Sequence, residues 1–330
     1  MTVFDTAPPP PQASVSVIVP SYNCGRFLAE ALDSLFGQTL QPQQIIVVDD
    51  GSSDDTAAVV GKYSSSRIQY IRKENGGAAS ARNVGLEAAK CEFIAFLDAD
   101  DRWQPSYVEK MHGYLEEDPT VVGTFGNFVR FDDATGQQSS DQFQSYPEIK
   151  RPVLLRDLPT AHGRIPKERA FSALVACADI PAYLQVMMFR RSAIENLRFD
   201  QKLGLGADVN FVLKTFLLGG VVFTDEVLAE VRQHDASASR RYGDVALHKL
   251  NGLKALAPHV TRDGDLLAYR ERLVRAHIDA AIQQTQQGRV GAGLRTFRDS
   301  FAIPGAAGRK LQGSARLAMA LPQGLTRSAP

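Results

Sequence analysis

An apolar run that ends in three carboxylates constrains this chain more than any other sequence feature. Residues 93–97 (Phe-Ile-Ala-Phe-Leu) contain no polar side chain, and Asp98, Asp100 and Asp101 follow directly. An uninterrupted apolar run of this length is typical of a strand buried on both faces, and in open α/β sheets ligands bind beyond the carboxyl ends of such strands. We therefore expect these carboxylates to lie at a ligand site.

Two interpretations of this acidic cluster remain open. Asp98 and Asp100 are two residues apart, so an extended chain would point both carboxylates to one side. A divalent cation that bridges to phosphate would then offset their repulsion. Alternatively, one aspartate caps a helix that starts near Pro105. Capping needs one carboxylate and the chain offers three, which favours the cation.

Similar strand ends occur earlier in the chain. Residues 45–48 (Ile-Ile-Val-Val) run into Asp49-Asp50 and a loop rich in Gly and Ser, and the apolar run at 15–20 leads into Ser21-Tyr22-Asn23. Strands alternating with helical patterns are typical of βαβ units in a doubly wound parallel sheet. The remaining expected elements are helices at about 27–35 and 56–63 and a weaker strand over 68–71.

A glycine pair lies between the last two of these strands. Asn75-Gly76-Gly77 leads into small residues and then into Arg82 and Asn83, which would reach the same sheet edge from a helix. Glycine lets a ligand approach the backbone closely, although a simple tight turn also explains such a pair. The sequence contains no Gly-x-Gly-x-x-Gly and no strand followed by Gly-Lys-Ser/Thr, which argues against a dinucleotide dehydrogenase and a P-loop NTPase.

Four motifs follow one another in the first hundred residues. They are Val-Ile-Val-Pro-Ser-Tyr-Asn at 17–23, Ile-Val-Val-Asp-Asp-Gly-Ser-Ser-Asp at 46–54, Asn-Gly-Gly-Ala-Ala-Ser-Ala-Arg-Asn at 75–83 and Leu-Asp-Ala-Asp-Asp at 97–101. In this order and spacing they resemble the nucleotide-binding half of the family-2 glycosyltransferases. The resemblance implies an inverting enzyme of GT-A fold, with a Rossmann-like, mostly parallel central α/β sheet flanked by helices, and a nucleotide-sugar donor.

The resemblance also implies roles for individual residues. Pro20 and Tyr22 match positions that line the nucleoside pocket, and Asp50 matches the acid that recognises the base. Asp98 and Asp100 match the Asp-x-Asp motif that holds Mg²⁺ or Mn²⁺ on the diphosphate. Further nucleotide-binding residues are expected at Asn23, Gly77, Arg82, Asn83 and Asp98.

The second half of the chain resembles the acceptor side of the family. Gly206-Ala207-Asp208 is similar to a Gly-Glu-Asp stretch whose Asp is the catalytic base, so Asp208 is the expected base, and Ala207 departs from the pattern. Capping of the helix predicted over 209–218 is the alternative role for Asp208. Residues 231–239 resemble an Arg-x-His-x-x-Ser-x-Ser segment, in which His234 would reach the metal or the diphosphate.

These features predict a non-processive inverting glycosyltransferase in surface polysaccharide or glycolipid assembly. The donor would be a nucleoside-diphosphate sugar, with UDP favoured on family frequency, and the acceptor a hydroxyl of a glycan or lipid-linked molecule. No Gln-x-x-Arg-Trp follows Asp208 and no apolar stretch approaches about 20 residues, which argues against the processive synthases. A nucleotide-sugar-binding protein without activity and a nucleotidyltransferase are the alternatives. Ala207 invites the first, and the second should carry a Gly-rich loop where this chain has Pro20-Ser21-Tyr22.

We expect three segments along the chain. Residues 1–14 would be a disordered leader, 15–240 the glycosyltransferase domain, and 241–330 a helical basic extension that is loose or only partly helical from Gly305 onward. Within the domain, 15–101 would form the nucleotide-binding half and 102–240 the acceptor half. Residues 132–170 would begin with a hairpin-like turn and form an acceptor-facing loop.

Charge and cysteine content bear on location and partners. Residues 241–330 hold 14 Lys and Arg against 6 Asp and Glu, although the whole chain has 37 of each kind. Such a segment either contacts an anionic membrane or packs its apolar residues on the domain with the basic face in solvent, and we favour packing. Nucleic-acid binding is not expected, because no aromatic residues interleave the charge. Cys24, Cys91 and Cys177 lack metal-site spacing, which indicates a reduced cytoplasmic protein, with contact at the inner membrane face as an open alternative.

Overall fold

Residues 10–63, 65–145, 162–177, 182–235, 243–305 and 307–320 are described by the computed structural model of the chain. Residues 1–9 of the expected leader lie outside the described residues, and the first strand already begins at Gln12. Of the expected acceptor-facing loop, residues 146–161 also lie outside the described residues. The hairpin-like turn that precedes them is present, because the Gln137 carbonyl accepts a hydrogen bond from the Asp132 amide at 3.0 Å.

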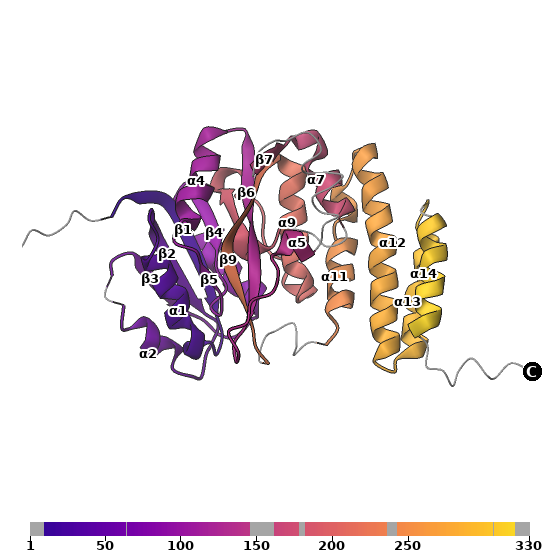
Figure 1. Cartoon of the computed structure of the whole chain (residues 1–330), viewed down its shortest axis with the longest axis horizontal. Coiled ribbons are helices and arrows are strands. Elements are labelled where there is room, and N and C mark those ends of the chain that lie inside the picture. Colours follow the sequence, from indigo (N-terminus) through magenta and orange to yellow (C-terminus); the bar gives the residue numbers. More distant parts are fainter. Residues whose placement is uncertain are drawn as a thin grey trace, which may run out of the picture.

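The first hundred residues form the parallel part of the sheet (Figure 1). Four strands lie in the order β3-β2-β1-β4, and each pairs parallel to its neighbour, which confirms the predicted βαβ alternation. Helix α2 is shorter than the expected 56–63. The strands are β1 (Gln12–Ser21), β2 (Gln41–Asp49), β3 (Ile68–Arg72) and β4 (Phe93–Phe96), and the linking helices are α1 (Gly25–Phe36), α2 (Thr56–Val60) and α3 (Ala78–Ala88).

The second half of the chain continues the same sheet with mixed strand directions. Strand β8 pairs antiparallel with β4 and β6, whereas β6 and β9 are parallel, so the parallel arrangement predicted from the sequence holds mainly for the first half. The strands are β5 (Arg102–Trp103), β6 (Val121–Asp132), β7 (His162–Ile165), β8 (Met187–Arg190) and β9 (Gly220–Gln233). The main helices are α4 (Tyr107–Glu117), α7 (Lys167–Ala176) and α9 (Gly206–Leu218), with short turns at α5 (Gln142–Ser145), α8 (Arg191–Ile194), η2 (Leu184–Val186) and η3 (Gln201–Leu203).

The apolar strands are buried because helices cover both faces of the sheet. Alternate residues of β1, such as Val17 and Ile18, belong to two different core clusters. One cluster includes residues of α1, α2 and α4, and the other includes residues of α3, α7 and α9. Helix α3 packs so closely that a Cβ at Gly85 would lie 2.3 Å from Ile18 Cγ2. This close packing brings the first turns of α3 to the carboxyl end of β1.

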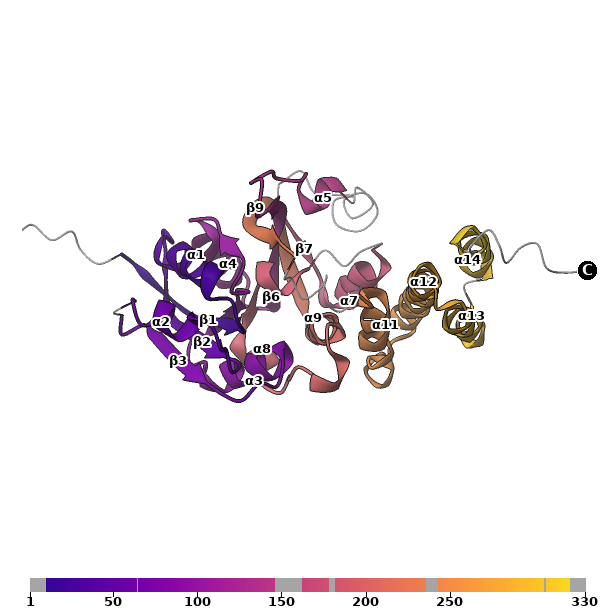
Figure 2. The same cartoon turned by 90° about the horizontal axis from the view of Figure 1, so that it is seen from below.

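In the described segments after the sheet, four helices stack outward from it (Figures 1 and 2). Helices α11 and α12 pack against α9 and α7, and Leu253 and Tyr269 belong to the same core cluster as Phe211. The favoured prediction of packing onto the domain holds for Leu266, Ala268 and Leu273, which pack against this cluster, whereas Leu267 is 62% exposed and Ile278 lies against Gly313 of α14. The helices are α11 (Val245–Lys254), α12 (Asp263–Gln286), α13 (Val290–Asp299) and α14 (Ala307–Ala320), with 3-10 turns at η4 (Ala257–His259) and η5 (Ser300–Ala302).

The C-terminal end contains a further helix. Of the stretch from Gly305 onward, which was expected to be loose or only partly helical, residues 307–320 form α14, and residues 321–330 lie outside the described residues. In the described part of the chain, every helix is too short or too polar to span a lipid bilayer.

A buried histidine in α12 makes the stability of this helical region depend on pH. The His277 ring is buried, and its Nδ1 lies 2.8 Å from the Leu273 carbonyl, which fits a proton on that nitrogen. Burial lowers the pKa of His277 from its ordinary value of 6.5, and the nearby Lys254 acts in the same direction, although the Leu273 carbonyl and Asp299 oppose the shift. The folded state therefore binds this proton more weakly than the unfolded state.

We expect the free energy of unfolding to fall as the pH drops below 6.5, and His277→Leu to remove part of that fall. Urea denaturation of both proteins between about pH 8 and about pH 5.5 measures it. His259→Asn is the matched control, because His259 is exposed and should leave the pH dependence unchanged. A His277→Leu variant that loses stability over this range as steeply as the wild type would contradict the account.

Candidate active site

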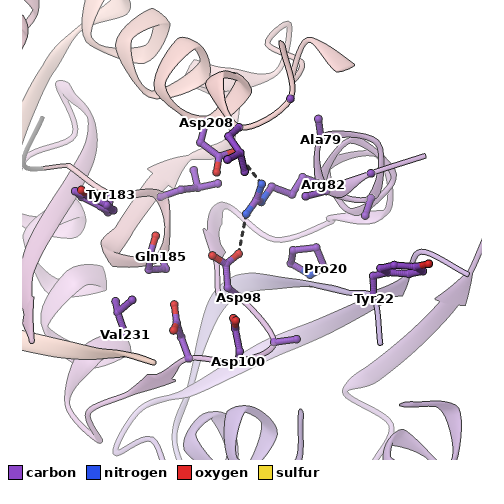
Figure 3. A pocket seen from close by; sticks show the side chains of 18 of the residues that line it. Pro20, Tyr22, Ala79, Arg82, Asp98, Asp100, Tyr183, Gln185, Asp208 and Val231 are labelled. Carbon is purple, nitrogen blue, oxygen red and sulfur yellow. Dashed lines mark hydrogen bonds and ion pairs between the residues drawn. The ribbon is translucent and has the colours of Figure 1, made fainter. Parts of the chain in front are cut away.

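A pocket of about 890 Å³ opens at the carboxyl ends of β1 and β4, next to the first turns of α3 and α9 (Figure 3). Because loops from both halves of the sheet meet at this edge, residues far apart in the sequence share the pocket. The sequence-predicted residues that line it are Pro20, Tyr22, Asn23, Asp50, Gly77, Arg82, Asp98, Asp100, Asp208 and His234.

Asn83 is the one sequence-predicted site residue that does not line this pocket. Its Nδ2 donates to the Phe199 carbonyl at 2.9 Å, and its Oδ1 accepts from the Phe199 amide at 2.8 Å. The side chain is thereby committed to the backbone that leads toward α9. The expectation that Asn83 reaches the ligand is therefore wrong for this structure, because both of its polar groups hold the fold.

Arg82 joins the two halves of the site. Its Nη2 donates to Asp98 Oδ1 at 2.7 Å and its Nη1 to Asp208 Oδ1 at 2.8 Å, while only 5% of the residue is exposed (Figure 3). Burial by itself would lower the pKa of the guanidinium, but the carboxylates of Asp208 and Asp98 outweigh it and raise the pKa. Arg82 is therefore a fixed cation between the end of β4 and the start of α9.

Asp208 is the third residue of α9, and its carboxylate points into the pocket (Figure 3). It makes no capping hydrogen bond to the helix, so the alternative role of helix cap is not observed. Loss of water in the pocket raises the pKa of Asp208 above its ordinary value of 3.8, with Arg82 opposing the rise and Asp98 adding to it. A carboxylate with a raised pKa is a better proton acceptor than an ordinary one.

Ala207 faces the opposite way from Asp208. It is buried in the core cluster that contains Phe211, and it does not line the pocket. A glutamate at this position would place a charge among apolar side chains at a large cost. Alanine at position 207, where the family pattern has glutamate, therefore fits the packing of the core, and the pocket lining is unaffected by it.

The acidic cluster forms a turn rather than the extended segment that the sequence suggested. The Asp101 amide donates to the Asp98 carbonyl at 3.0 Å. Asp98, Asp100 and Asp101 all line the pocket, and the buried Asp101 carboxylate also accepts a hydrogen bond from the Arg232 amide at 2.9 Å. Asp101 therefore fixes the end of β9 against this turn.

His234 contacts Asp100 at the side of the pocket formed by the acidic turn and the end of β9. Its Nε2 lies 3.0 Å from Asp100 Oδ2, and its ring packs on Phe27 with the centroids 4.6 Å apart. Burial raises the pKa of Asp100, and the charge of Asp98 adds to the rise, while the contact with His234 opposes it. A bound cation would offset the repulsion between the Asp98 and Asp100 carboxylates.

Asp98, Asp100 and His234 carry the ligand atoms that a divalent cation accepts, and Asp100 and His234 also lie close enough together to share one. Carboxylate oxygen and imidazole nitrogen are ligands that Mg²⁺ and Mn²⁺ accept, and Asp100 and His234 already touch. Across the described ranges, no three His, Cys, Asp or Glu side chains converge closely enough to hold a metal alone. Asp98 is a more distant third candidate because its Oδ1 is held by Arg82. Phosphate oxygens of a ligand would have to complete such a site.

Asp50 holds the glycine turn at the end of the pocket that Pro20 and Tyr22 also line. Its Oδ1 accepts from Lys73 Nζ at 2.6 Å and from the Gly76 amide at 3.0 Å, and its Oδ2 accepts from the Gly77 amide at 2.7 Å. Gly77 has φ +85°, a conformation that favours glycine, and a Cβ there would meet no atom within 4 Å. Recognition of the base by Asp50 stays a prediction, and what the geometry shows is the fixing of this loop.

The same end of the pocket also contains Asn23, Pro20 and Tyr22. Asn23 adopts φ 52°, and its Oδ1 accepts from the Ser53 amide at 2.8 Å, so its side chain joins two loops. Tyr22 is exposed at the mouth of the pocket, where its ring is available for contact with a planar ligand group (Figure 3). These residues give this end of the pocket a proline ring, an exposed aromatic ring and an amide side chain.

The far end of the pocket is lined by residues that the sequence did not predict. Tyr183 and Gln185 line it from the η2 region, and Lys249, Leu253 and Arg272 line it from α11 and α12. Nothing local marks these positions, because they lie in ordinary helical and loop sequence. Arg232 was also missed as a framework residue, although it precedes His234 in the quoted motif. Its guanidinium bonds the Asp100 carbonyl at 2.9 Å and Asp133 Oδ1 at 2.6 Å.

The Arg82 bridge yields a prediction about stability. Arg82→Met leaves Asp98 and Asp208 facing each other without a cation, and we expect a loss of about 1–3 kcal/mol in the free energy of unfolding. The lower part of this range is expected, because the two carboxylates keep 32% and 39% exposure to water. Urea denaturation of the unliganded protein measures the change.

A double variant tests whether the lost stability comes from repulsion between the two carboxylates. Adding Asp208→Asn to Arg82→Met removes the repulsion and should restore part of the stability. If the double variant is less stable than Arg82→Met by the full effect of Asp208→Asn alone, the two residues do not interact as described.

Comparison with known proteins identifies the chain. Residues 16–176 match the model of the family Glycosyl transferase family 2. The glycosyltransferase GlyG of Streptococcus pneumoniae is 36% identical over 126 residues, which cover 37% of this chain and 41% of that protein. The uncharacterized glycosyltransferase RT0329 of Rickettsia typhi is 30% identical over 248 residues, which cover 73% of this chain and 70% of that protein.

A solved structure shares the fold. The mannosyltransferase PcManGT from Pyrobaculum calidifontis, in complex with GDP-Man and Mn²⁺, superposes with a TM-score of 0.56 at 17% identity, covering 98% of this chain and 85% of that chain. The predicted GT-A fold is therefore confirmed. Together with the relative that is aligned over most of both chains, the comparisons show that this chain belongs to glycosyl transferase family 2.

Proposed function

We propose that the protein is a metal-dependent, inverting, non-processive glycosyltransferase. It moves a sugar from a nucleoside-diphosphate sugar, with UDP as the first candidate, to a hydroxyl of a glycan or lipid-linked acceptor in surface polysaccharide or glycolipid assembly. The observation that carries the proposal is the placement of Asp208 across the pocket from Asp98 and Asp100, with Arg82 fixed between them (Figure 3). Family membership supports it.

The donor would lie along the side of the pocket that runs from Pro20 and Tyr22 to the acidic turn at Asp98 and Asp100. Pro20 and Tyr22 border the nucleoside end, and the Gly76-Gly77 turn held by Asp50 lets the ligand approach the backbone. Asp100 and His234, with Asp98 beside them, would hold a divalent cation next to the diphosphate. When bound, such a cation supplies positive charge to a leaving group that becomes more negative as its bond to the sugar breaks.

The acceptor would enter from the opposite side, where Asp208 faces the pocket. In the proposed step the acceptor oxygen forms a bond to the anomeric carbon while the bond from that carbon to the diphosphate oxygen breaks. Asp208 takes the proton of the acceptor hydroxyl, and one displacement inverts the configuration. Arg82 keeps the Asp208 carboxylate oriented through the 2.8 Å contact to Oδ1.

The far end of the pocket supports the placement of the acceptor there. Lys249 and Arg272 contribute positive charge and Leu253 contributes apolar surface beyond Asp208. An acceptor that carries a phosphate beside an apolar portion would match this lining.

We place the reaction in the cytoplasm, and none of the three cysteines, all of which lie in described segments, forms a disulfide.

Asp208→Asn should lower the transfer rate by about 10²–10⁴-fold, because the amide cannot accept the proton. Donor binding should persist, since Asp208 lies across the pocket from the diphosphate. Release of nucleoside diphosphate in the presence of a mixed acceptor extract measures transfer, and calorimetry measures binding. The matched control is Asp263→Asn at the exposed start of α12, which should transfer like the wild type. Full activity of Asp208→Asn would assign the base elsewhere.

The wild-type rate should also depend on pH. Since the pKa of Asp208 is raised above 3.8, its carboxylate is protonated at a higher pH than an ordinary aspartate. We expect kcat/KM to fall as the pH is lowered through this raised pKa and to level off above it. A rate that stays constant down to the ordinary aspartate range would exclude Asp208 as the titrating base.

Nucleotide binding tests the donor site and separates the alternatives. Calorimetry with UDP, GDP and dTDP should show tight binding of one nucleotide that requires Mn²⁺ and is lost in Asp100→Asn but kept in Asp263→Asn. Binding without transfer or donor hydrolysis would favour a nucleotide-sugar-binding protein. Release of pyrophosphate from a nucleoside triphosphate and a sugar phosphate would favour a nucleotidyltransferase. No binding of any of the three nucleotides to folded protein would overturn the donor site.

A further inference from the structure

The outer side of α13 presents apolar and cationic side chains to solvent together. Leu294 is 47% exposed and Phe301, in the adjoining turn η5, is 52% exposed, while Arg295 and Arg298 are exposed between them. Positions 294, 295 and 298 share one face of a helix, and Phe301 continues that face. We call these four residues the α13 face.

The α13 face is held in place by the packing beneath it. A Cβ at Gly293 would lie 2.4 Å from Thr285 Oγ1, so α13 sits directly on α12. The Phe301 ring meets Phe297 edge to face, with the centroids 5.2 Å apart, and Lys310 Nζ lies 6.0 Å from the Phe301 centroid. The exposure of Phe301 is therefore a feature of an ordered turn with a cation beside it.

The sequence around this face is rich in basic residues, and one of them, Arg316, is paired with Asp279 of α12 at 3.1 Å. Residues 290–320 contain five Arg and Lys and one acid, Asp299. The Asp299 carboxylate lies 3.3 Å from the Arg298 guanidinium, so part of the negative charge of Asp299 is offset by Arg298. Figures 1 and 2 place α13 and α14 at the end of the molecule farthest from β1, β2 and β3, with no other described element outside them. The α13 face is thus open to a large partner.

We propose that the α13 face binds an anionic lipid bilayer. Exposed Leu and Phe side chains next to Arg and Lys are the combination that inserts at the boundary of acyl chains and headgroups, with the cations on anionic headgroups. A second copy of the chain fits less well, because a two-fold contact would set the same arginines against each other. Nucleic acid would use the cations but leave Leu294 and Phe301 without a role.

The bilayer contact would bring the enzyme to a lipid-linked acceptor. Helix α12 supports α13 and packs on α11, and these two helices also line the far end of the pocket through Arg272 and Lys249. The inference adds a partner surface to the proposed function and names where the membrane contact lies. Its test measures vesicle binding and not sugar transfer, so the two proposals fail independently.

The experiment is cosedimentation of the full chain with vesicles. We expect binding to phosphatidylcholine vesicles that contain about 30% phosphatidylglycerol and much weaker binding to phosphatidylcholine alone, with the difference reduced by salt. The double variant Leu294→Ser and Phe301→Ser should bind about tenfold more weakly. Arg295→Glu with Arg298→Glu should abolish the preference for the anionic vesicles.

Leu267→Ser is the matched control, because Leu267 is 62% exposed on α12 outside the α13 face. All variants should keep wild-type nucleotide binding, since none of these residues lines the pocket. Three results would overturn the proposal. They are no binding of the wild type to anionic vesicles at low salt, equal binding of the α13-face variants, and a wild-type dimer in sedimentation velocity that Leu294→Ser with Phe301→Ser converts to monomer.

Discussion

The buried guanidinium of Arg82 is the interaction on which the rest of the site depends. A cation this deeply buried is stable only with anionic partners, and the chain supplies Asp98 from the end of β4 and Asp208 from the first turn of α9. These partners come from separate halves of the sheet, so their pairing fixes one half relative to the other. The same pairing sets the two carboxylates on either side of the pocket.

A second buried arginine frames the opposite wall. Arg232 bonds the Asp100 carbonyl, Asp133 and Glu30, and its amide bonds Asp101, so the end of β9 and the acidic turn are fixed as one unit. His234 is two residues further on and meets Asp100 because of this anchoring. The pocket thus has two rigid walls joined by charge pairs, which is what a site needs to place a donor and an acceptor with little reorganisation.

The sequence predicted the parts of this structure that depend on local pattern. Apolar runs that end in acids located β2 and β4, and the motif order located the residues of the donor end. It failed where a side chain has a choice of partners. Asn83 looks like a site residue in the sequence, but backbone groups of Phe199 take up its polar atoms, and it does not line the pocket. The cations at the far end of the pocket were missed because α11 and α12 reach it only through tertiary packing.

The central claim is that a cation and a nucleoside diphosphate bind at the acidic turn, across the pocket from Asp208. Crystals grown with Mn²⁺ and UDP, or whichever nucleotide binds in solution, would test it directly, since anomalous scattering locates manganese. We predict one strong peak within coordination distance of Asp100 and His234 that also contacts the phosphates, with Arg82 still joining Asp98 and Asp208. A manganese peak away from Asp100, or a nucleotide bound with its phosphates beside Asp208, would contradict the account.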